Sequence, residues 1–236
     1  AGRRRSPKCR TPFMIFSQRA TPMGEAYRFP LRVVDGLRLE KEVRDALLPG
    51  RTVLDDTGRE RRLPRYFYEI PTWNVAMDLQ LSPSFALSEF IQTDVREAPP
   101  LRAFPRYVPC AITLTALCLE RFRGVVGTYV HIAANGGYRS PRHAMSGNAT
   151  PHSWGTAVNI YRIGDVFLDD REAIERYAAL ARQELPGVWT RPFGTHRGQT
   201  DDHLHLDFGY VTSTPRNAPL PALEGPPIFE LEQRAL

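Results

Sequence analysis

Two helix-length segments stand among short β-rich runs in the second half of the chain, and this order limits the folds it can adopt. Residues 110–123 and 169–185 carry apolar side chains at helical spacing. Runs rich in β-branched and aromatic residues lie between and after them, at 129–133, 156–161 and 203–210. We therefore predict an α+β fold, in which a small, mostly antiparallel sheet carries the last two runs and both helices flank it.

The first of these helices is predicted to belong to the core. Ala111, Leu114, Cys118 and Phe122 recur at spacings that place them on one apolar side, and Gly124 follows as a stop signal.

Changes in amino-acid composition along the chain suggest four parts. The predicted parts are a basic arm (1–30), an N-terminal extension (31–80), a domain (81–211), and a tail (212–236) that contains five prolines. We expect both arms to contact partner proteins, because long arms with few apolar groups are usually ordered only when bound.

The basic character of the chain belongs to its N-terminal arm. The whole chain has a net charge of +5, but residues 1–20 hold six basic and no acidic groups, so the remainder is close to neutral. Such an arm could bind nucleic acid, anionic lipid headgroups or an acidic protein, or could be a solvated tail. No apolar run approaches 18 residues, so no transmembrane helix is predicted.

Three cysteines form an odd set without CxxC spacing, which suggests neither a disulfide framework nor a thiolate zinc site. We expect Cys110 and Cys118 to be small core residues.

Histidines near turns and acids carry the strongest chemical signal. His152 precedes Asn159 by seven positions, and His203 and His205 follow some fifty residues later. His203 and His205 share one face if their segment is extended, because side chains alternate along a strand. A loop histidine, a polar strand residue and a histidine on a neighbouring strand can converge as three zinc ligands and leave a fourth position open for water.

Three motifs in this order resemble the zinc D-alanyl-D-alanine carboxypeptidase family, which includes bacterial cell-wall peptidases and shares its metal site with the hedgehog signalling domain. The motifs are GYRSPRH at 137–143, HSWGTAVNI at 152–160 and DHLHLD at 202–207. A segment at 85–90 also resembles the start of this domain, so the resemblance covers about 81–210. It implies a zinc hydrolase of peptidoglycan stem peptides, located in the periplasm or outside a bacterial cell, or carried by a phage.

The resemblance assigns roles residue by residue. His152 and His205 match zinc ligands, and Asp202 matches the general base that takes a proton from the metal-bound water. Arg139 matches the arginine that holds the substrate carboxylate or polarises the scissile carbonyl. Asn159 stands where the family has an aspartate ligand, and an amide oxygen is a weak, neutral ligand for zinc.

Two functions compete on these residues. The chain is either a zinc peptidase, or a catalytically inactive pseudo-peptidase that serves as a structural or binding subunit of a larger assembly through residues 1–30 and 212–236. The long arms and Asn159 favour the second function, whereas the first is favoured by the intact His152, His205, Asp202 and Arg139. Nucleic-acid binding is the weakest of the readings, because no basic face interleaved with aromatic residues appears in the body of the sequence.

Several residues also have a plain structural explanation. Arg139 could anchor the turn after Gly137, and His203 is expected to be structural rather than catalytic. We expect His131 and His196 to have no function, and Trp154 to pack in the core.

Overall fold

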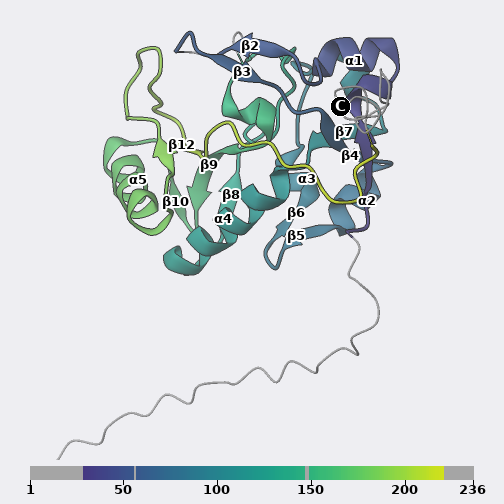
Figure 1. Ribbon diagram of the computed structural model, residues 1–236. Helices are drawn as coiled ribbons and strands as arrows, with labels where there is room; N and C mark the ends of the chain where they lie inside the picture. The colour runs from purple at the N-terminus through teal and green to yellow at the C-terminus, as the bar shows by residue number, and fades with distance from the viewer. Residues whose placement is uncertain (1–28, 56, 147–148, 221–236) are drawn as a thin grey trace, which may run out of the picture. The chain divides into compact units, whose positions relative to one another are not determined.

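The computed structural model describes residues 29–55, 57–146 and 149–220 (Figure 1). The chain divides into two units after Pro30, and every described helix and strand belongs to the second. Nearly all of the predicted basic arm and residues 221–236 of the predicted tail lie outside the described residues.

A five-stranded antiparallel sheet forms the second half of this unit, which confirms the α+β prediction. Its strands run in the order β10-β9-β12-β11, and β8 also pairs with β9. They are β8 (Val130–Ile132), β9 (Ala157–Ile163), β10 (Val166–Phe167), β11 (Trp189–Thr190) and β12 (Leu204–Asp207).

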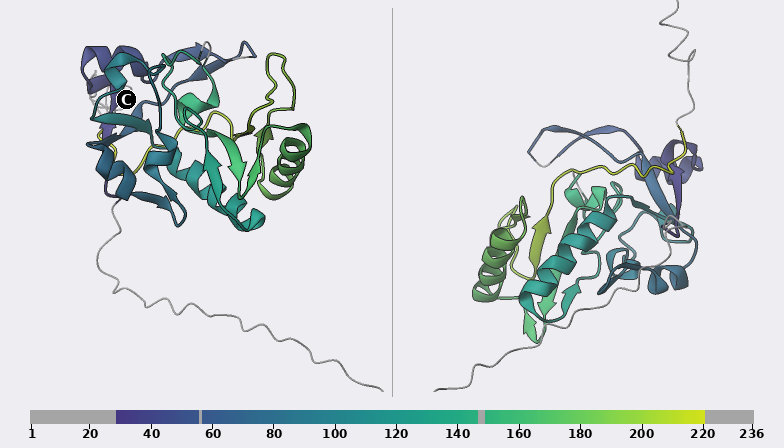
Figure 2. Two further views of the ribbon diagram at one scale, coloured as in Figure 1. Left: turned by 180° about the vertical axis from the view of Figure 1, so that it is seen from behind. Right: turned by 60° about the horizontal axis from the view of Figure 1, so that its bottom comes forward.

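Helices α4 (Ile112–Val126) and α5 (Arg171–Glu184) lie beside this sheet and contact each other (Figures 1 and 2). The Asp170 side chain caps α5 by accepting a hydrogen bond from Ala173 N at 2.8 Å. Among the described residues, no helix has the length and apolar character needed to cross a membrane.

The prediction for α4 is wrong in two details. The core-facing residues include Ile112, Ala116 and Leu119, whereas Leu114 is 45% exposed, so the apolar side is rotated from the predicted one. The helix also continues through Gly124 and ends at Gly127, whose φ of 69° supplies the left-handed cap.

A second sheet joins the predicted extension to the predicted domain. It has the order β1-β4-β7, and β7 comes from beyond residue 80. Its strands are β1 (Arg32–Asp35), β4 (Tyr66–Ile70) and β7 (Arg106–Pro109).

Two two-stranded sheets and several short helices complete the described elements. The strand pairs are β2 (Thr52–Leu54) with β3 (Glu60–Arg62), and β5 (Gln80–Ser82) with β6 (Phe85–Ala86). The short helices are α1 (Lys41–Leu47), α2 (Trp73–Asp78), α3 (Leu87–Phe90), η1 (Gly36–Arg38), η2 (Pro99–Leu101) and η3 (Pro151–Trp154).

Trp154 is packed between segments from opposite ends of this unit. Its ring is fully buried, contacts Leu63, and donates from Nε1 to the carbonyl oxygen of Arg62 at 3.0 Å. Tyr210, which follows β12, packs edge-on against it with 4.9 Å between ring centroids. The packing role expected for Trp154 is confirmed.

Gly137 lies where two backbone segments approach too closely for any side chain. A Cβ atom there would come within 2.1 Å of the carbonyl oxygen of Phe90. That oxygen accepts a hydrogen bond from Tyr138 N at 2.7 Å, and Asn135 N donates to the carbonyl oxygen of Gln92 at 2.7 Å. The loop that carries the GYRSP motif is therefore fixed against the end of α3.

Replacing Gly137 by Ala should lower the free energy of unfolding by at least about 1–3 kcal/mol, because the added methyl group meets backbone that cannot move aside. Urea unfolding measures this value. Gly124→Ala is the control: nothing lies within 4 Å of its added methyl group, and alanine stabilises a helix interior relative to glycine by about 0.5–1 kcal/mol. Equal stability of the two variants would contradict the close approach.

Candidate ligand-binding site

The pairing of β9 with β12 places Asn159 directly opposite His205. Both side chains are buried, and His205 Nδ1 lies 2.8 Å from Asn159 Oδ1. The amide oxygen can only accept, so His205 Nδ1 carries the proton and Nε2 keeps its lone pair.

His152 approaches this pair from η3. Its Nδ1 donates to the carbonyl oxygen of Gly137 at 2.8 Å, which leaves the lone pair on Nε2. Nε2 is buried and has no hydrogen-bond partner among the described residues. The rings of His152 and His205 lie 5.1 Å apart between centroids. The structure therefore brings together the three residues predicted as ligands.

Both imidazoles are held in the neutral form. Burial is the main cause that places the pKa of His152 well below its usual value, and the positive charge of Arg139 adds to it. Burial likewise lowers the pKa of His205, and Arg191 is the next cause.

Arg139 is a buried cation, and no carboxylate of the described residues lies at hydrogen-bonding distance from it. The residue is 6% exposed, and its Nε atom has no hydrogen-bond partner within the described parts of the chain. Its Nη1 lies 4.0 Å from Met145 Sδ. Burial, followed by the charge of Arg191, lowers the pKa of Arg139 to about 10. A guanidinium in this environment gains from any anion that reaches it.

Asp202 does not join the buried histidines. Its side chain is 79% exposed, and its Oδ1 lies 2.5 Å from Nδ1 of His203. His203 is the more buried of the two, and its Nε2 has no hydrogen-bond partner among the described residues. Burial lowers the pKa of His203, and the Asp202 carboxylate opposes this effect. The carboxylate predicted as general base thus contacts the site through an imidazole.

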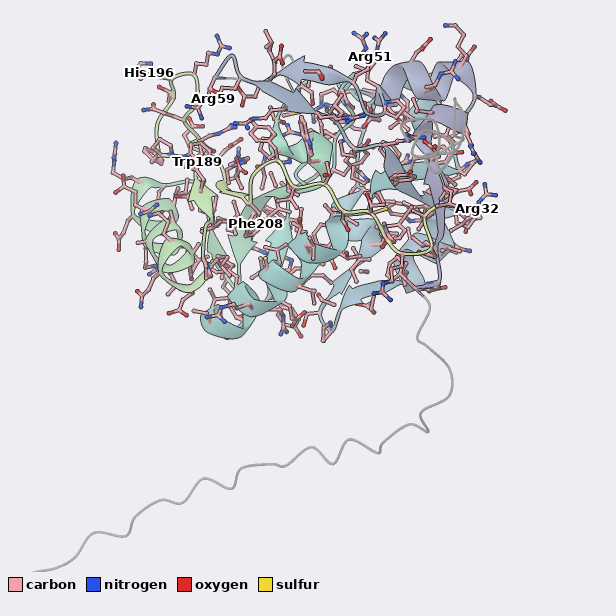
Figure 3. All side chains as sticks on the ribbon, viewed as in Figure 1. Arg32, Arg51, Arg59, Trp189, His196 and Phe208 are labelled. Carbon is pink, nitrogen blue, oxygen red and sulfur yellow. The ribbon has the colours of Figure 1, made fainter. Side chains whose placement is uncertain are left out.

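Two further residues of the site, one on the edge strand β11 and one just after it, were not singled out by the sequence. Trp189 is 48% exposed, and its ring lies 5.8 Å from that of His205 between centroids. Figure 3 shows it beside β12, below the loop that carries His196. Arg191 follows Trp189 by two positions. Its positive charge contributes to the lowered pKa values of three histidines, His152, His203 and His205. The alternate spacing of Trp189 and Arg191 in an extended segment that begins with β11 was the signal that could have revealed them.

Buried polar groups fix the loop that carries Arg139. The Glu97 carboxylate accepts from Ser140 Oγ at 2.6 Å and from Ser140 N at 3.2 Å. His143 Nδ1 accepts from Met145 N at 3.1 Å, so its Nε2–H donates to Asn135 Oδ1 at 3.0 Å. His143 therefore has a structural role. Glu97 comes from a proline-rich loop in which the sequence carries no signal for it.

The donors present here are a poor fit to zinc. The buried Nε2 lone pair of His152 is a suitable ligand, but Asn159 adds only a neutral amide oxygen that already accepts from His205. Arg139 and Arg191 both act on these imidazoles, and both are positive. Among the described residues, no group of three His, Cys, Asp or Glu side chains could hold a metal ion.

Comparison with known proteins adds no relative: no family model, curated protein or solved structure matches this chain. The residues of the site and their geometry therefore carry the functional assignment.

The buried histidines should make the fold sensitive to mild acid. Below about pH 6.5 the unfolded chain protonates His152 and His205, whereas the folded chain holds them neutral. The free energy of unfolding should therefore fall with decreasing pH, by about 1.4 kcal/mol per pH unit for each of the two histidines. Urea unfolding between pH 7.5 and 5.5 measures the slope, to which His131, His143 and His203 add in the same direction.

A variant isolates one of these contributions. His205→Asn should reduce the slope by about one histidine's share, because it removes one of the two imidazoles that the fold holds neutral. An unchanged slope in His205→Asn would show that this imidazole is not held neutral.

Proposed function

We propose that this domain is a pseudo-peptidase that binds the carboxylate end of a peptide without hydrolysing it. The observation that carries the proposal is the buried Arg139 guanidinium, whose Nε has no hydrogen-bond partner among the described residues. A peptide carboxylate would supply the missing anion through charge-assisted hydrogen bonds.

The neutral pairing of Asn159 with His205 supports binding rather than hydrolysis. In a peptidase of the resembled family, an aspartate at this position would bring negative charge to the metal. Here the amide brings no charge to the two histidines, while the Asp202 carboxylate lies in solvent. The site therefore favours an anionic ligand over a cationic one.

Substrate class, location and partners of this proposal come from the motif resemblance. The ligand would be a peptidoglycan stem peptide, and the protein would act at a bacterial cell wall, in the periplasm or outside the cell, or in a phage. The segments 1–30 and 212–236 would bind protein partners in a larger assembly. Residues 212–220 also contact the chain's own second unit, where Arg38 Nη2 donates to the carbonyl oxygen of Leu220 at 3.3 Å.

A zinc hydrolase is the second candidate, and one observation favours it. His152 Nε2 is a buried lone pair without a hydrogen-bond partner in the described structure, as a metal ligand would be before the metal is bound. Stoichiometric zinc in protein purified without chelator, together with cleavage of a D-Ala-D-Ala peptide, would establish this candidate and refute the pseudo-peptidase.

Calorimetric titration with an acylated D-Ala-D-Ala peptide tests the binding proposal. The free acid should bind, and its C-terminal amide should bind at least about tenfold more weakly, because the charge-assisted contact with Arg139 is lost. Arg139→Lys should cause a comparable loss for the free acid, since lysine lacks the planar fork of donors. Arg142→Lys, an exposed change in the same loop, should leave affinity unchanged. Equal binding of acid and amide would rule out carboxylate recognition.

Asn159→Asp tests the position that separates the two candidates. The added carboxylate should raise zinc affinity by roughly one to two orders of magnitude, because it brings negative charge to neutral donors. A competition titration against a chelator measures the change. Asp202→Asn is the matched control: its carboxylate is exposed, so its loss should leave zinc affinity unaltered. If Asn159→Asp has no effect, residue 159 is not a ligand position and the alignment of this motif is wrong.

A further inference from the structure

A row of four rings lies on β9, on β10 and at the start of β8, outside the buried centre. The rings belong to Tyr129, His131, Tyr161 and Phe167, and successive centroids are 6.3, 6.0 and 6.4 Å apart. Tyr129 is 68% exposed, Phe167 54% and Tyr161 37%. Exposed large aromatic side chains in a contiguous group mark an interaction surface more often than isolated ones do.

A β-bulge creates this row. Ile160 pairs with Ile132 and Arg162 pairs with His131, so Tyr161 is the extra residue on β9. Ile160 and Ile163 are both buried, whereas Tyr161 and Arg162 between them lie outside the core. The bulge therefore turns two consecutive side chains outward, where a regular strand would bury one of them.

Arginine side chains are interleaved with the rings. The Arg162 guanidinium carbon lies 5.9 Å from the ring centroid of Tyr161 and 5.7 Å from that of Phe167, and that of Arg123 lies 5.4 Å from Tyr129. Arg162 Nη2 also lies 3.1 Å from His131 Nε2.

The positive charges of Arg162 and Arg123 are not paired with a carboxylate of the described residues. Arg162 Nε has no hydrogen-bond partner among the described residues, and no ion pair within the described ranges joins Arg162 or Arg123 to a carboxylate. The only acidic residue of the β9–β10 hairpin is Asp165, in its exposed turn.

We propose that this surface binds single-stranded nucleic acid. Bases would stack on Tyr129, Tyr161 and Phe167, while Arg162 and Arg123 would meet the phosphates. Exposed aromatic side chains on neighbouring strands of one sheet, with cations between them, recognise unpaired nucleotides in this way. The N-terminal twenty residues add six positive charges to the same chain. The arginines favour this ligand over a neutral glycan, which needs no cations.

The folded chain displays a face that the sequence does not reveal. Along the sequence, nucleic acid is disfavoured because no basic stretch is interleaved with aromatic residues. Such a face is formed by residues from three strands, by Tyr129 just before β8 and by Arg123 of α4, so it exists only after folding.

Fluorescence anisotropy of the full chain with a labelled oligothymidylate of about twelve nucleotides tests the proposal. Binding should weaken steeply between about 50 and 200 mM salt, and a duplex of the same length should bind more weakly. Tyr129→Ala and Phe167→Ala should each weaken binding on the order of tenfold, because each removes a stacking platform. Both rings are exposed, so neither change should unfold the protein; a thermal melt checks this.

Matched variants separate the surface from the basic arm. Arg162→Ala should weaken binding clearly more than Arg176→Ala, an equal charge change at an exposed position on α5. Trp73→Ala removes an exposed ring outside the row and should have no effect. Unchanged affinity in Tyr129→Ala and Phe167→Ala would overturn the proposal, even if the arm still binds nucleic acid. Absence of binding, or salt-independent binding of a neutral glycan instead, would also overturn it. None of these outcomes depends on whether Arg139 binds a peptide carboxylate.

Discussion

The contact between the Gly137 backbone and the end of α3 is the constraint on which the candidate site depends. No side chain fits between Gly137 and Phe90, and the Gly137 carbonyl oxygen held there accepts from Nδ1 of His152, which fixes the tautomer of that histidine. The same loop delivers Arg139 two residues later. One backbone approach thus determines both where the imidazole lone pair lies and where the buried cation lies.

Local patterns in the sequence predict much of this arrangement. They fail for side chains whose orientation is determined by tertiary contacts. The antiparallel sheet, both long helices and the convergence of His152, Asn159 and His205 follow from periodicity and motif order. The orientation of Asp202 does not follow, because its neighbour His203 competes for it as a hydrogen-bond partner. Glu97 is also unpredictable: its loop has no periodicity, and it meets Ser140 only after the chain has folded.

The five-stranded sheet carries two surfaces of different character. Asn159 faces a closed centre in which neutral imidazoles and cations are buried, whereas Tyr161 and Arg162, only two and three positions along β9, belong to an exposed aromatic row. The bulge at Tyr161 marks the change from one to the other. One strand can therefore serve two kinds of ligand, because the irregularity in its pairing separates their side chains.

The burial of Trp154 limits how this chain could be shortened. Leu63 and the Arg62 carbonyl oxygen, which contact the indole, come from about ninety residues before it in the sequence. Tyr210, which also packs against it, comes from more than fifty residues after it. A fragment cut to residues 81–211 would expose the indole face that Leu63 covers and leave its N–H without an acceptor, two residues after His152. The smallest fragment expected to fold with its site intact must therefore begin well before residue 62 and extend past Tyr210.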